Sequence, residues 1–160
     1  MLENEIILTD FECDFASHVG RTRQLEAMNK GLEHRYGYEG SGWSNHIEGA
    51  CGEMAVAKYL NRYWNGSVNT FKTGGDVGNV QVRMRRDHDH DLIIREADRD
   101  EDYFVLVTGQ APEFRIGGYI LAKDAKAMTE YFKTFDKRPK AWFIPANKLI
   151  YLPPGKIGKS

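Results

Sequence analysis

The segment GGDVGNVQVRMR, residues 74–85, contains polar side chains at a spacing that could support chemistry. If positions 78–79 form a two-residue turn, the flanking valines pair and Asp76 lies directly opposite Gln81. Arg83 follows two residues later on the same face of the strand. A carboxylate, an amide and a guanidinium would then cluster, either as a functional site or as a polar ladder on an exposed sheet face.

A second carboxylate that needs explaining is Glu53, in the stretch HIEGACGEMAVAKYL. Apolar residues surround most of this segment, which predicts a largely buried helix over about 46–61 with Ser44 or Asn45 as N-cap. Gly49 and Gly52 would let another backbone approach. Glu53 lies beside the apolar stripe, where an ionised carboxylate is costly without a cation.

The run RRDHDHD, residues 85–91, combines imidazoles and carboxylates, which are ligands for Zn²⁺ or Mn²⁺. A solvated hairpin loop between the strands VQVRMR and DLIIR is the reading we favour. Arg85 and Arg86 beside it would either pair with these acids or contact the backbone of DNA.

Taken together, HIEGACGEMAVAKYL, GGDVG and QVR resemble the motifs of the PD-(D/E)XK nuclease superfamily, above all its small phage-encoded members. The likeness extends from about His46 to Ile150 and includes DLIIREADRDEDYFVLVTG and GGYI. It implies a restriction-endonuclease-like core in which one mixed central β-sheet is flanked by helices.

The resemblance also implies roles for four residues. Glu53 and Asp76 would be metal ligands, Gln81 would occupy the second-carboxylate position as a third ligand, and Arg83 would occupy the lysine position. Such oxygen ligands suit Mg²⁺ or Mn²⁺, which would polarise the scissile phosphate and lower the pKa of a bound water.

These roles predict a divalent-metal-dependent nuclease that hydrolyses phosphodiester bonds in DNA. Gln81 offers only a neutral carbonyl oxygen, and Arg83 stays protonated, so it can stabilise phosphate charge but cannot activate water. The alternative is therefore a non-catalytic protein of the same fold that binds nucleic acid or a host protein, with a homodimer as a further candidate. A third reading is an unrelated α+β domain in which Glu53 and Asp76 pair with nearby arginines.

Composition narrows the classes of protein. The chain has 160 residues, of which 41% are hydrophobic and 28% charged, so one folded domain is expected. The formal net charge of −1 means that any contact with DNA must come from local patches. Two cysteines are too few for a disulfide framework, and no apolar run approaches the ~20 residues that cross a bilayer. We expect a cytoplasmic protein, in the bacterial host if phage-encoded, without membrane contact.

The first predicted helix begins at Thr9, whose spacing to Glu12 is that of a capping box, and ends near Gly37. Its expected buried face is apolar, and its basic face is expected to be solvated. The apolar positions are Phe11, Phe15, Val19, Leu25, Met28 and Leu32, and the basic ones are Arg21, Arg23, Lys30 and Arg35.

Short β-like runs follow after Asn65-Gly66 and predict a meander. A third helix is expected over Lys123–Phe135, and Gly117-Gly118 predicts a bulge or a close backbone approach. The class is α/β in the α+β arrangement, with a helical segment over 1–40, a core over 44–152 and a frayed tail over 153–160. The predicted strands are TFKT, VQVRMR, DLIIR, YFVLVTG, FRIGGYILA, AWFIP and LIYLPP.

Overall fold

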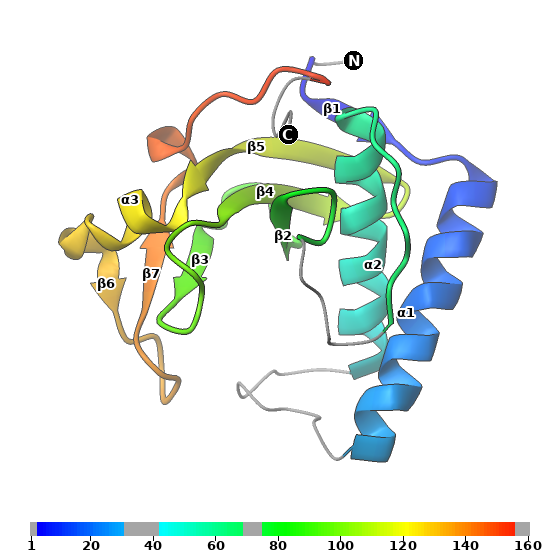
Figure 1. The fold of residues 1–160 in the computed structure, drawn as a ribbon, viewed down its shortest axis with the longest axis horizontal. Coiled ribbons are helices and arrows are strands. Elements are labelled where there is room, and N and C mark those ends of the chain that lie inside the picture. Colours follow the sequence, from blue (N-terminus) through cyan, green and yellow to red (C-terminus); the bar gives the residue numbers. More distant parts are fainter. Residues whose placement is uncertain (1–2, 31–41, 69–74, 156–160) are drawn as a thin grey trace.

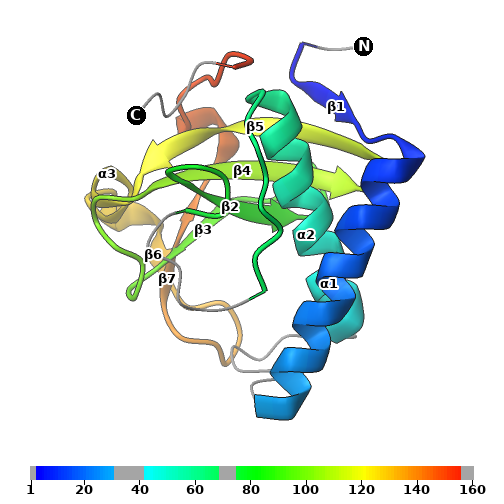
Figure 2. The same cartoon turned by 45° about the vertical axis from the view of Figure 1, so that its right-hand side comes forward.

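A computed structural model describes residues 3–30, 42–68 and 75–155 of the chain. It has an α+β fold with a pair of helices and two sheets, in which α1 and the smaller sheet lie at opposite ends of the molecule (Figures 1 and 2). The predicted class and the mixed sheet are confirmed, whereas the second sheet was not predicted. The predicted strand TFKT lies outside the described residues.

The larger sheet, sheet A, has the strand order β1-β5-β4-β2. Its central strand β4 is buried at every position between its two ends, so it needs a neighbour on both sides. β5 pairs with it antiparallel and β2 pairs with it parallel. The strands are β1 (Glu5–Ile7), β2 (Val80–Arg85), β4 (Tyr103–Gln110) and β5 (Glu113–Leu121).

The smaller sheet, sheet B, is antiparallel with the order β3-β7-β6. The expected hairpin between VQVRMR and DLIIR is therefore wrong, because the first run pairs with β4 in sheet A and the second pairs with β7 in sheet B. The intervening loop connects two sheets. The strands are β3 (Leu92–Arg95), β6 (Phe132–Lys133) and β7 (Ala141–Ile144).

Helices α1 (Asp10–Lys30) and α2 (Gly42–Tyr59) pack closely against each other. The capping box is confirmed: the Thr9 N–H donates to Glu12 Oε1 over 2.7 Å, and the Glu12 N–H donates to Thr9 Oγ1 over 3.1 Å. The predicted end near Gly37 lies outside the described residues, and α2 begins at Gly42, earlier than predicted.

The predicted buried face of α1 is largely wrong. Of the predicted apolar positions in the described part of α1, Val19 is buried, while Phe11 is 79% exposed and Leu25 51%. The other buried residues of the helix are Ala16, Gly20 and Gln24. A Cβ on Gly20 would lie 2.5 Å from the Ile47 Cα. The helices approach so closely that only small side chains fit between them, which turns the larger apolar residues outward.

Sheet A carries a core on each face. One core lies between the sheet and the helix pair, and it includes Val80 and, partly buried, Met84 from β2. The other core lies toward sheet B and includes Phe104 and Leu106 from β4. Since side chains alternate along a strand, Gln81, Arg83 and Arg85 point to the face of β2 opposite to α2.

The bulge at Gly117 is confirmed, since Leu106 pairs with Gly118 whereas Val107 pairs with Ile116. A Cβ on Gly118 would lie 2.8 Å from the Ile150 carbonyl oxygen, so both expectations for this glycine pair hold. The segment LIYLPP forms only an isolated bridge at Ile150 in place of the predicted strand.

The long third helix is wrong. The chain forms a five-residue helix α3 (Ala122–Lys126), a 3₁₀ turn η1 (Thr129–Tyr131) and then β6. The Phe132 and Trp142 rings lie 4.3 Å apart, so pairing with β7 takes the place of helical continuation. A second 3₁₀ turn, η2 (Ala146–Lys148), follows β7. In the described part of the chain, no helix combines the length and apolar composition that crossing a bilayer requires.

Candidate nucleic-acid interface

Glu53 is buried as predicted, with 8% of the residue exposed, and α2 directs its carboxylate toward α1. Arg23 donates from Nη1 to Oε2 over 2.8 Å and from Nη2 to Oε1 over 3.0 Å. The Trp64 indole N–H donates to Oε1 over 3.1 Å. Three N–H donors therefore hold both carboxylate oxygens, and the cation that the burial of Glu53 requires is Arg23.

The expectation of a solvated basic face on α1 is wrong for Arg23. Its side chain is 14% exposed, its Nε donates to the Ser67 carbonyl oxygen over 2.9 Å, and its guanidinium lies 6.0 Å from the centre of the Trp64 ring. The alternation of charges along the helix gave no signal to distinguish Arg23 from the exposed Arg21. The position of α2, which carries Glu53, determines that Arg23 is the arginine that is buried.

The predicted turn at Gly78-Asn79 is confirmed. Val77 and Val80 exchange backbone hydrogen bonds of 3.1 and 3.0 Å, and Gly78 has a φ of +59°. Asp76 Oδ2 accepts a hydrogen bond of 2.9 Å from the Val82 N–H. Because β2 is an edge strand of sheet A, the carboxylate satisfies a backbone donor that sheet pairing leaves unused.

Asp76 lies before β2, and the bridge recorded at this turn joins Val77 and Val80, with no bridge between Asp76 and Gln81 among the described residues. A Cβ on Gly75 would lie 2.3 Å from the Val80 carbonyl oxygen, so the hairpin does not continue beyond Val77.

Arg83 lies on the same face of β2 as Gln81. Its Nη2 donates to Asp98 Oδ1 over 2.6 Å, and its guanidinium lies 4.8 Å from the centre of the Phe104 ring. Asp98 Oδ2 also accepts the Arg95 N–H over 2.7 Å. Arg83 thus connects the β2 edge to the loop after β3.

The expected donor set for Mg²⁺ or Mn²⁺ does not fit this arrangement. Gln81 and Arg83 share one face of β2, whereas Glu53 belongs to the helix that packs on the other face. Both oxygens of Glu53 accept N–H groups, and the adjoining Arg23 guanidinium would repel a divalent cation. A metal at Glu53 would first have to break a buried ion pair.

Arg85 ends β2, and the other residues of RRDHDHD, 86–91, lie in the loop between β2 and β3, so the expected loop is confirmed although the hairpin is not. Asp87, Asp89 and His90 bring one potential ligand atom each within 4.8 Å of the others. Both aspartates are exposed, and His90 Nε2 lies 3.3 Å from Asp87 Oδ2. A contact between side chains on an exposed turn is an ordinary surface feature, and it needs no metal to explain this grouping.

Three guanidiniums gather where β2 ends, and we call Arg85, Arg95 and Arg138 the arginine cluster. All three are half-buried. Burial lowers the pKa of Arg85, and so do the nearby charges of Arg138 and Arg95, while Asp91 and Asp87 oppose them. Arg85 Nη1 donates to the Asp91 carbonyl oxygen over 2.6 Å.

Among the described residues, Arg85 and Arg138 are not held by a carboxylate in the way that Arg23 is. Within the described ranges, neither Arg85 nor Arg138 forms an ion pair with a carboxylate. Arg86 is exposed beside the cluster. Sequence analysis identified Arg85 and Arg86 but missed Arg95 and Arg138, which come from β3 and from the β6–β7 connection. A nearby anion would relieve the repulsion between such charges.

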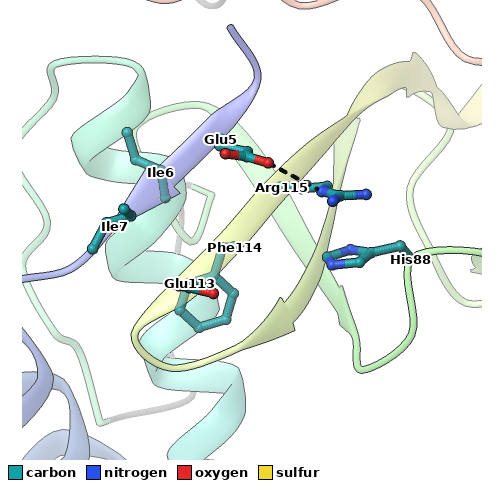
Figure 3. A pocket seen from close by; sticks show the side chains of 7 residues that line it. All are labelled: Glu5, Ile6, Ile7, His88, Glu113, Phe114 and Arg115. Carbon is teal, nitrogen blue, oxygen red and sulfur yellow. Dashed lines mark ion pairs between the residues drawn. The ribbon is translucent and has the colours of Figure 1, made fainter. Parts of the chain in front are cut away.

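A separate pocket of about 120 Å³ lies between β1, β5 and the loop after β2 (Figure 3). Arg115 Nε lies 3.6 Å from Glu5 Oε1, and His88 Nδ1 is within hydrogen-bonding distance, 2.7 Å, of Thr108 Oγ1. None of the predicted site residues lines it. The lining residues are Glu5, Ile6, Ile7, His88, Glu113, Phe114 and Arg115.

No family model, no curated protein and no solved structure matches this chain.

Proposed function

We propose that the protein binds nucleic acid without cleaving it, through the arginine cluster and the adjacent Arg86. The observation that carries this proposal is the proximity of Arg85 and Arg138, two half-buried guanidiniums that form no ion pair with a carboxylate within the described residues, although the charges of Asp91 and Asp87 lie near Arg85. Keeping like charges together is unfavourable unless an anion joins them. A phosphodiester group suits this role because guanidinium forks bind phosphate oxygens in bidentate fashion.

The charge distribution supports a local contact with modest affinity. The whole chain has a net charge of −1, so no general positive field attracts nucleic acid. A few arginine–phosphate contacts release a correspondingly small number of counterions, which predicts non-specific dissociation constants on the order of 10⁻⁴–10⁻⁶ M with a shallow salt dependence.

A binding assay tests this function. Fluorescence anisotropy of a labelled duplex should show Arg138→Gln binding about three- to tenfold more weakly than wild type, with the salt slope reduced by about one counterion. Arg21→Gln is the matched control, because Arg21 is an exposed arginine of α1. Equal affinities for wild type and Arg138→Gln would contradict the proposal.

Hydrolysis of DNA phosphodiester bonds with Mg²⁺ or Mn²⁺ is the second candidate function. The observation that favours it is the shared face of Gln81 and Arg83 on β2, next to the Asp76 carboxylate that accepts the Val82 N–H. Against it, Arg83 is permanently protonated and paired with Asp98, and Glu53 is held by Arg23.

Incubation of supercoiled plasmid with either metal separates the two candidates. Nicking by wild type that disappears in Asp76→Ala would favour hydrolysis. Binding without any nicking, in wild type and variant alike, would favour the binding function. A melting curve of Asp76→Ala controls for loss of folding, because this carboxylate also accepts the Val82 N–H.

A further inference from the structure

The β6–β7 hairpin, residues 132–144, presents an aromatic ring to solvent next to a group of cations. Phe135, in the connection between the strands, is 62% exposed. Figure 1 shows this connection in orange, extending below the strands of sheet B. The Arg138 N–H donates to the Phe135 carbonyl oxygen over 3.3 Å, and Asp136 has a φ of 59°. The tip is therefore a defined turn.

The exposed ring is supported from beneath by a second ring. The centres of Phe135 and Phe143 lie 6.4 Å apart with an interplanar angle of 49°, and Lys133 Nζ lies 5.4 Å from the centre of the Phe143 ring. In the sheet register, Lys133 and Arg95 both pair with Ala141, so these two cations share one face of sheet B. Phe143 lies two residues after Ala141 and shares that face as well.

Charge is concentrated at this hairpin. Positions 133–140 carry four cations against the single carboxylate of Asp136, in a chain whose overall charge is −1. Within the described residues, none of these four cations forms an ion pair with a carboxylate. Lys140 Nζ lies 5.6 Å from the centre of the Phe132 ring. The cations are Lys133, Lys137, Arg138 and Lys140.

We propose that this hairpin binds single-stranded nucleic acid, with an unpaired base stacked on Phe135 and the adjoining phosphates held by the surrounding lysines. The inference rests on the proposed nucleic-acid binding and adds a preference for unpaired strands. Arg138 belongs both to the hairpin and to the arginine cluster, so one strand can continue from the ring to the guanidiniums.

The preference for a single strand follows from the exposure of Phe135. A duplex stacks its bases inside the helix and offers phosphates at its surface, so it can use the cations but not the ring. An unpaired base has a free face for the ring, and such stacking is tolerant of sequence. Alternation of aromatic and basic side chains is the arrangement that single-strand-binding surfaces use.

The test compares affinities for three fluorescein-labelled probes by anisotropy at low salt: a twenty-nucleotide oligothymidylate, a twenty-nucleotide oligouridylate and a twenty-base-pair DNA duplex. Wild type should bind at least one single strand more tightly than the duplex. Phe135→Ala should weaken single-strand binding about tenfold and change duplex binding less than about twofold. Phe135→Trp should retain single-strand affinity, because an indole also stacks on bases.

Phe11→Ala is the matched control, since it removes another exposed phenylalanine, 79% exposed, from α1 at the opposite end of the molecule. It should leave all three affinities unchanged. Thermal melting of both alanine variants verifies folding, and the exposure of the two rings predicts melting temperatures close to that of wild type.

Two results would overturn the inference. If the duplex binds as tightly as both single strands and Phe135→Ala behaves like Phe11→Ala, the preference for unpaired strands is wrong while nucleic-acid binding stands. If no probe binds, both the inference and the proposed function are wrong.

Discussion

Two regions of the molecule place arginine guanidiniums in partly or largely buried surroundings, and they treat them differently. Between α1 and α2, Arg23 meets the carboxylate of Glu53 through two hydrogen bonds, and Trp64 donates a third to the same group. At the end of β2, Arg85 has Arg138 and Arg95 as near neighbours. In the first region a carboxylate balances the charge of the guanidinium, whereas the second region has an excess of positive charge.

The difference indicates which region is structural and which is available for a ligand. A buried carboxylate held by a guanidinium on both oxygens has no remaining reason to bind a metal. Two neighbouring guanidiniums that form no ion pair in the described part of the chain, such as Arg85 and Arg138, gain stability from an incoming anion. The residues that the sequence offered as candidates for chemistry therefore have different roles. Glu53 stabilises the helix pair, and Arg85 belongs to the candidate interface.

The largest effect on stability is expected from breaking the Arg23–Glu53 ion pair. Glu53→Gln leaves Arg23 buried without its counter-charge, which should lower the free energy of unfolding by about 3–5 kcal/mol. Urea unfolding measures the change. Glu26→Gln is the control, because Glu26 forms a 3.9 Å pair with Lys30 in which both side chains are nearly half exposed. If the two variants lose equal stability, the pair with Arg23 is not the main structural role of Glu53.

The next effect concerns the helix contact that brings Arg23 to Glu53. A Cβ on Gly20 would collide with the Ile47 backbone, so Gly20→Ala should cost about 1–3 kcal/mol of stability. A Cβ on Gly49 meets no atom within 4 Å, so the expected backbone approach there is absent. Gly49→Ala should therefore gain about 0.5–1 kcal/mol through helix propensity. Thermal melting of both variants checks the opposite signs.

The arginine cluster should respond to a free anion. Inorganic phosphate at about 50 mM should raise the melting temperature of wild type by roughly 2–4 °C relative to sodium chloride of equal ionic strength. Arg138→Gln should lose most of this increase, and Arg21→Gln should keep it. An increase of equal size in all three proteins would indicate a general salt effect and remove the distinction between the two regions.

The smallest effect tests a partly exposed pair at the start of α1. Burial acts to raise the pKa of Glu12, but hydrogen bonds from Lys58 and Thr9 outweigh it, and the pKa is lowered. A lowered pKa in the folded state means that the stabilisation is present near neutral pH and is lost as the pH falls below about 4.3 and through the folded-state pKa. Glu12→Gln should cost about 1 kcal/mol at pH 7 and show a shallower loss of stability at acid pH. Urea unfolding of wild type and Glu12→Gln at pH 7 and at acid pH measures these changes. Identical dependence of stability on pH in the two proteins would contradict the prediction.

The sequence by itself determined the local features of this protein. The capping box at Thr9, the turn at Gly78-Asn79, the burial of Glu53 and the bulge at Gly117 were all predicted and are present. Each depends on hydrogen bonds, backbone angles or apolar periodicity within a few residues, so the local sequence is enough to predict it.

Only the tertiary structure decided which distant groups meet. Arg23 and Glu53 are 30 residues apart, and nothing in the sequence indicated that Arg23, in place of another arginine of α1, would pair with that carboxylate. The parallel pairing of β2 with β4 inside sheet A likewise joins segments that are distant in sequence, and the gathering of Arg85, Arg95 and Arg138 required sheet B to pack beside the end of β2. Such contacts depend on how apolar surfaces pack across the whole domain, and the spacing of side chains along one segment does not determine that packing.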